Sequence, residues 1–75
     1  MKKSIHRERF EKVASNRVQK TIDSLNSLSK CSNIYNYEYN KKDVDVMMKE
    51  IKNTLSKAES LFRSNLKNSS SKFKF

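Results

Sequence analysis

Hydrophobic residues recur every three or four positions in two stretches of the chain, which is the period of an α-helix. The first stretch predicts a helix over 5–30, with an apolar side made of Phe10, Val13, Ala14, Val18, Ile22, Leu25 and Leu28. The second predicts a helix over 41–66, with an apolar side made of Val44, Met47, Met48, Ile51, Leu55, Ala58, Leu61, Phe62 and Leu66. Both helices are therefore expected to be amphipathic.

The residues that precede each stretch carry the signals of a helix start. Ser4 is the expected N-cap of the first helix, and Glu8 stands four residues before Lys12, a spacing that favours an ion pair. Asn40 and Asp43 form a variant of the capping box in front of the second helix. Both helix starts are thus predicted from local sequence alone.

Between the two helices, residues 31–40 read CSNIYNYEYN and are predicted to be an extended connector. Its three tyrosines are expected to pack on the helix ends. Residues 67–75 are rich in serine and lysine and lack periodicity, so we expect a disordered basic tail there. Residues 1–66 then form one structural unit, since 75 residues leave room for a single domain at most.

The predicted fold class is all-α, an antiparallel helical hairpin made of the two amphipathic helices. A chain this short buries too little surface to be more than marginally stable as a monomer, so we expect two hairpins to dimerise into a four-helix bundle. The expected core comprises Phe10, Val13, Val18, Ile22, Leu25, Leu28, Val44, Met47, Ile51, Leu55 and Phe62.

Composition argues against several classes of enzyme. The chain has neither glycine nor proline, which phosphate-binding loops and tight hairpins usually require. Its one histidine, His6, and its one cysteine, Cys31, stand far from each other and from any motif spacing. We therefore expect no catalytic activity, no cofactor and no metal site.

The expected location is the cytoplasm, without a membrane anchor. A single cysteine permits no internal disulfide, which suits a reducing compartment. No apolar run approaches the roughly 20 residues of a membrane-spanning helix, and the N-terminus lacks the apolar segment of a signal peptide.

Charge points to an anionic partner. Lysine and arginine number 17 against 8 acidic residues, which gives a net charge of +9. We expect non-specific nucleic-acid binding through basic and amide side chains opposite the apolar sides: Arg9, Lys12, Asn16, Lys20, Lys49, Lys52 and Arg63. The simpler alternative is that these lysines only keep the surface soluble.

Four further residues are candidates for a contact. Arg17 projects into the apolar side of the first helix, where it must extend to water, pair with an acid such as Glu38 or Glu50, or reach a phosphate. The other three are the connector tyrosines Tyr35, Tyr37 and Tyr39. As an alternative to packing on the helix ends, their rings are able to stack on unpaired bases.

A second function class is a protein-interaction module, such as an inhibitor or an anti-defence protein that acts on a host protein. The adjacent methionines Met47 and Met48 would give an adaptable docking surface, and the positive charge would suit an acidic target. Binding that resists nuclease and salt would favour this class over nucleic-acid binding.

Residues 9–51 resemble a family of small uncharacterised helical proteins from plasmids, conjugative elements and phages of Gram-positive bacteria (Firmicutes). The resemblance lies in Arg17, in Ser32 and Asn33, and in a run that reads Asn36, Tyr37, Glu38 and Tyr39. It implies a helical fold and a mobile-element context, and it transfers no activity and no functional residues.

Overall fold

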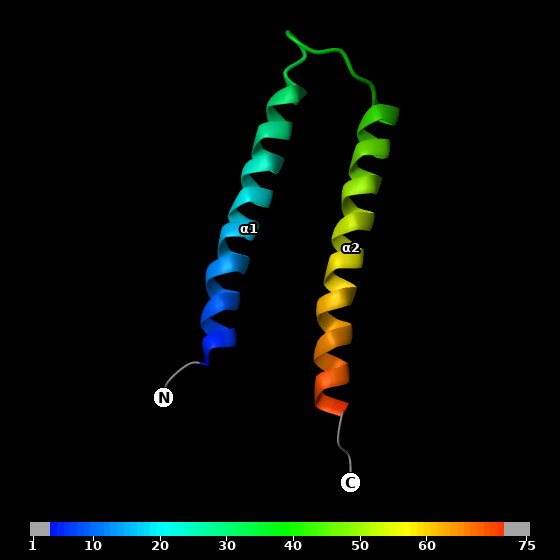
Figure 1. Cartoon of the computed structure of the whole chain (residues 1–75). Helices are drawn as coiled ribbons and strands as arrows, with labels where there is room; N and C mark the ends of the chain where they lie inside the picture. Colours follow the sequence, from blue (N-terminus) through cyan, green and yellow to red (C-terminus); the bar gives the residue numbers. More distant parts are fainter. Residues whose placement is uncertain (1–3, 72–75) are drawn as a thin grey trace. The chain divides into compact units, whose positions relative to one another are not determined.

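The computed structural model describes residues 4–71, and the side chains of residues 4–67. From residue 5 to 71 the described part is helical except for the segment 33–40, and it contains no strand. Helix α1 spans Ile5–Ser29, the short 3-10 helix η1 spans Lys30–Ser32, and helix α2 spans Lys41–Ser71 (Figure 1). The chain divides into two units, Met1–Glu38 and Tyr39–Phe75, each built around one long helix. The prediction of an all-α protein with two long helices is confirmed.

Helix α1 begins as its cap predicts. Ser4 has extended backbone angles, and its Oγ accepts a hydrogen bond of 3.0 Å from the Arg7 backbone N–H. That bond satisfies one of the backbone donors that every helix start leaves without an intrahelical acceptor. The helix ends at Ser29, one residue before the predicted boundary, and then tightens into η1.

A turn organised by Asn33 follows η1. The Asn33 carbonyl oxygen accepts hydrogen bonds from the backbone N–H groups of Asn36 (3.1 Å) and Tyr37 (3.0 Å). Its side-chain Oδ1 accepts a third bond from the Tyr35 N–H (2.9 Å), the geometry of an Asx turn. Every described residue here has a negative φ, so the turn requires no glycine. The first half of the predicted connector therefore contains a hydrogen-bonded turn, and residues 37–40 belong to no helix or strand.

Helix α2 starts with the predicted capping box but continues beyond its predicted end. It runs to Ser71, so the expectation of disorder from residue 67 is wrong for residues 67–71, while residues 72–75 lie outside the described part. The physical reason is that nothing in residues 67–71 stops a helix. Lysine, asparagine and serine cost at most about 0.7 kcal/mol each relative to alanine, far less than proline.

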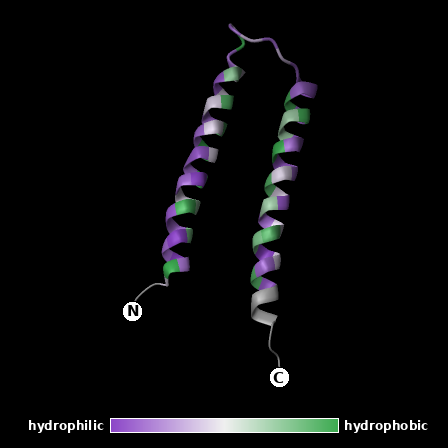
Figure 2. Cartoon of the chain, viewed as in Figure 1, coloured by the Kyte–Doolittle hydropathy of each residue, from purple (hydrophilic) through white to green (hydrophobic). Residues whose placement is uncertain are grey.

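No side chain among residues 4–67 is buried. Figure 2 shows hydrophobic residues recurring among hydrophilic ones along both helices. Of the eleven residues predicted to form the core, only Leu28, Val44 and Ile51 are half-buried, and the other eight are exposed. Neither unit buries these residues by itself, and a core between helices or between chains stays a prediction. An amphipathic helix cannot bury its own apolar side, because its side chains diverge from the axis and must pack on another element.

Candidate nucleic-acid interface

The polar side of α1 carries four of the predicted contact residues on one narrow face. Arg9, Lys12, Asn16 and Lys20 are all exposed, and at 3.6 residues per turn they fall within a sector of about 80°. At a rise of 1.5 Å per residue, Arg9 and Lys20 stand about 16 Å apart along the axis. That length corresponds to roughly five phosphates of one DNA strand. We call this set the α1 polar face.

The cations of the α1 polar face have no acidic partner within the described residues. Arg7 pairs with Glu11, with Nε 3.0 Å from Oε2, whereas Glu8 and Lys12 form no ion pair within the described residues, so their predicted pair is wrong. Arg7 also lies over the ring of Phe10, 5.5 Å from its centroid, and so turns towards the apolar side of the helix. Arg9, Lys12 and Lys20 are left available to an external anion.

Arg17 lies among the apolar residues of α1, as its position predicts, and it is exposed. Within the described part its guanidinium makes no ion pair or hydrogen bond. Its backbone carbonyl accepts a 2.9 Å bond from the Thr21 hydroxyl. Extension of the guanidinium to water, one of the three predicted alternatives, agrees with this exposure.

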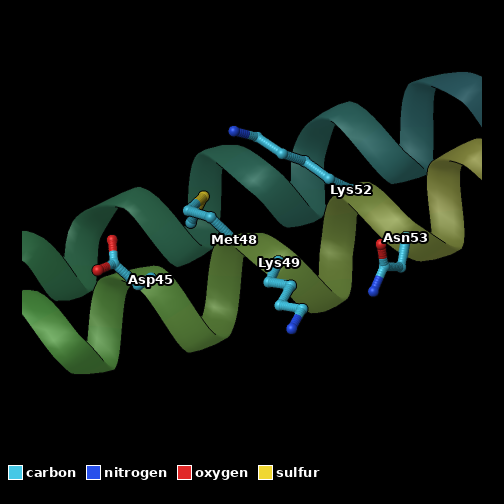
Figure 3. Close-up of a pocket in the computed structure, with 5 residues that line it drawn as sticks. All are labelled: Asp45, Met48, Lys49, Lys52 and Asn53. Atoms are coloured by element: carbon cyan, nitrogen blue, oxygen red, sulfur yellow. The ribbon is translucent and has the colours of Figure 1, made fainter.

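Helix α2 contributes Lys49 and Lys52, which border an open depression on its surface. Asp45, Met48 and Asn53 complete the lining, so the depression follows one side of a single helix over about two turns (Figure 3). Figure 3 shows the Lys49 and Lys52 ammonium groups pointing away from each other. The two ammonium groups therefore do not meet at one point of the depression. These lysines suit two neighbouring phosphates better than a single enclosed anion.

Arg63, the last predicted contact on α2, is held by an acid. Glu59 Oε2 accepts hydrogen bonds from Arg63 Nη2 at 2.6 Å and from Nε at 2.8 Å. Both side chains are largely exposed, so the pair contributes little to stability. It does offset the charge of Arg63, which makes Arg63 a weaker attractor of phosphate than Lys49 or Lys52.

The three tyrosines of the connector differ in exposure. The exposed fraction is 92% for Tyr35, 53% for Tyr37 and 39% for Tyr39. Packing on a helix end is thus wrong for Tyr35, whose ring is almost fully exposed, and it stays a prediction for Tyr37 and Tyr39. The stacking alternative for the rings of Tyr35 and Tyr37 remains a prediction.

Sequence reasoning missed two features of this surface that spacing alone was able to reveal. Glu59 precedes Arg63 by four residues, the distance at which oppositely charged side chains meet on a helix. Asn53 follows Lys49 by four residues and therefore lines the same depression. A helical wheel that includes every charged and amide residue shows both Glu59 beside Arg63 and Asn53 beside Lys49.

The described residues offer no other chemistry. They hold no group of three or more histidine, cysteine, aspartate or glutamate side chains placed to bind a metal ion. Cys31 is exposed as a free thiol. No helix in the described part combines the length and the apolar character needed to cross a bilayer.

Comparison with known proteins returns no match. The sequence fits no protein-family model, and it matches neither a curated protein nor a solved structure at a significant level.

Proposed function

We propose that this chain is a small non-enzymatic protein that binds nucleic acid through the exposed polar sides of its helices. Its biological context in this proposal is that of an accessory protein of a mobile genetic element, as the sequence resemblance implies. A cytoplasmic location belongs to the same proposal, because a free, exposed thiol such as Cys31 suits a reducing compartment.

The observation that carries the proposal is the unpaired charge of the α1 polar face. Arg9, Lys12 and Lys20 share one side of α1 without an acidic partner in the described part. Cations that lie within a Debye length of phosphates displace condensed counterions, which gives affinity without sequence preference. Asn16, on the same side, adds an amide that is able to donate to a phosphate or a base edge.

Helix α2 would extend the footprint. Lys49 and Lys52 add two exposed cations, and Arg63 contributes less because its guanidinium already forms an ion pair with Glu59. The net charge of +9 favours an anionic partner over a neutral one, since the long-range field attracts the partner before any contact forms.

We also propose that the two helices pack as an antiparallel hairpin and that two hairpins dimerise into a four-helix bundle. Both helices contain a seam with alternating steps of three and four residues, the spacing of paired helices. The seams are Ala14, Val18, Thr21, Leu25 and Leu28 on α1, and Val44, Met48, Ile51, Leu55, Ala58 and Phe62 on α2. Met47 and Leu61 widen the apolar side of α2 along one flank. One partner helix covers a single seam, so this widened side supports a bundle of more than two helices.

A protein-interaction module remains the second candidate, and one observation favours it. Leu61 and Leu66, towards the end of α2, are 65% and 70% exposed, and Phe62 between them is exposed as well. Such a group of apolar side chains suits the groove or helix of another protein, including an acidic target. An inhibitor or anti-defence role would act through this end of α2 and not through the α1 polar face.

Two double variants of equal charge test nucleic-acid binding. Lys12→Gln with Lys20→Gln removes two cations of the α1 polar face, whereas Arg7→Gln with Arg63→Gln removes two cations that already have acidic partners. Each lowers the net charge from +9 by two, to +7. Binding of nuclease-treated protein to labelled random-sequence DNA at about 0.1 M salt is then compared.

We expect the α1 pair of substitutions to weaken binding by at least about tenfold and the control pair to weaken it much less. Equal losses in the two variants would mean that affinity follows total charge and not this face. Wild-type protein that binds neither single-stranded nor double-stranded DNA would contradict the proposed function as a whole.

A further inference from the structure

The connector presents an exposed aromatic surface on an ordered backbone. Tyr35 is 92% exposed and Tyr37 is about half exposed, and the Asn33 turn fixes the backbone of both through three hydrogen bonds of 2.9–3.1 Å. A large ring in water is a free energy cost that a partner removes. Because the backbone is already ordered, little further conformational entropy is lost when a partner binds.

The charges around this turn identify the chemistry of the partner. Lys30 lies in η1, three residues before Asn33, and it is exposed. Glu38 is the single acid among residues 30–40, and Lys41 and Lys42 follow in the sequence. Exposed aromatic rings in a segment with lysines nearby in the sequence suit a partner with both phosphates and flat rings, as in nucleic acid.

Only unpaired bases offer free faces to such rings. In a duplex the base faces are stacked on one another, so a tyrosine on a loop reaches them only at an end or where the helix is opened. We infer that Tyr35 and Tyr37 form a stacking site for the bases of single-stranded nucleic acid, with Lys30 beside it for a phosphate. This site deepens the proposed function and rests on it, since it selects among nucleic acids by strandedness.

The chain provides its own reporter for this site. It has no tryptophan, and its three tyrosines all lie between residues 35 and 39. Intrinsic tyrosine emission therefore reports on the connector alone, without a label. The probes are an oligothymidylate of about 16 nucleotides, an abasic oligomer of the same length, and a random-sequence duplex.

We expect oligothymidylate to quench tyrosine emission and the abasic oligomer to leave it nearly unchanged, because only the former has rings to stack. Tyr35→Leu keeps an apolar side chain and removes the ring, and we expect it to weaken oligothymidylate binding about 5- to 150-fold. Tyr35→Phe keeps the ring, and we expect it to bind within about threefold of wild type. The high exposure of Tyr35 makes both variants compatible with the fold, which circular dichroism checks.

The possible failures are distinguishable. Duplex and oligothymidylate binding of equal strength, with unchanged emission and a wild-type affinity for Tyr35→Leu, would overturn the stacking site and leave nucleic-acid binding intact. Under that result the ring is free to serve a protein partner. Absence of binding to all three probes would overturn the stacking site together with the proposed function.

Discussion

Asn40 and Asp43 cap each other at the start of α2. The Asp43 backbone N–H donates to Asn40 Oδ1 at 2.9 Å, and the Asn40 backbone N–H donates to Asp43 Oδ2 at 2.9 Å. The two bonds satisfy two donors that would otherwise lack acceptors at the helix start, and they place a carboxylate near the positive end of the helix dipole. The reciprocal pair thus fixes the residue at which α2 begins.

Removal of the cap side chain is expected to destabilise α2. Asn40→Ala should lower the free energy of unfolding by about 1 kcal/mol, because the Asp43 N–H loses its acceptor. Asn40→Ser retains an oxygen acceptor and should cost only a few tenths of that value. Thermal unfolding followed by circular dichroism measures both variants. Identical unfolding of wild type and Asn40→Ala would show that the pair is dispensable.

Helix starts were predictable here because the interactions that make them are local. Ser4 with Arg7, and Asn40 with Asp43, lie three residues apart, so their sequence spacing already contains the geometry. The end of α2 lacked such a signal. Without a proline or a glycine to terminate it, the helix continues through residues that we had assigned to a tail by composition.

Release of Arg63 from its acid is expected to strengthen nucleic-acid binding. Glu59→Gln removes one negative charge and frees a cation, whereas Glu50→Gln removes one negative charge and frees none, because Glu50 forms no ion pair within the described residues. We expect Glu59→Gln to raise affinity for random-sequence DNA by up to about fivefold, and more than the control does. Equal gains in the two variants would place Arg63 outside the interface.

The apolar side of α2 is expected to tolerate no charged side chain, because in the proposed bundle other helices cover it. Ile51→Asp should lower the free energy of unfolding by about 3 kcal/mol or more, or dissociate the assembly, because the new carboxylate would be buried without a partner. Asn53→Asp introduces the same group about 160° away around the helix and should have little effect. Circular dichroism and sedimentation give helix content and mass. Wild-type melting and mass for Ile51→Asp would show that this side stays in water.

The candidate site was predictable as a set of faces but not as a set of pairs. Helical periodicity placed Arg9, Lys12 and Lys20 on one side of α1, and the structure has all three there. Spacing did not decide which of the possible ion pairs form. Arg7 with Glu11, Glu8 with Lys12 and Glu59 with Arg63 all stand four residues apart, and the structure has only the first and the last of these three pairs.

The exposure of Tyr35 also escaped sequence reasoning. Alternating tyrosines suggested packing on helix ends, which would have hidden the rings from solvent. The Asx turn at Asn33 instead depends on a side-chain hydrogen bond to the Tyr35 N–H, and composition did not single out that asparagine among the others in the connector. The ring stands 92% exposed in a turn that this local bond helps to hold.

The dependence of binding on salt tests most directly the claim that unpaired helix cations contact phosphates. For nuclease-treated wild-type protein and a single-stranded DNA, the logarithm of the association constant is plotted against the logarithm of the salt concentration. Five unpaired cations, Arg9, Lys12, Lys20, Lys49 and Lys52, predict a straight line with a slope of about −3 to −4, and the Lys12→Gln, Lys20→Gln variant should reduce its magnitude by about 1.4. Affinity that does not change with salt, or a slope identical in the variant, would contradict the account.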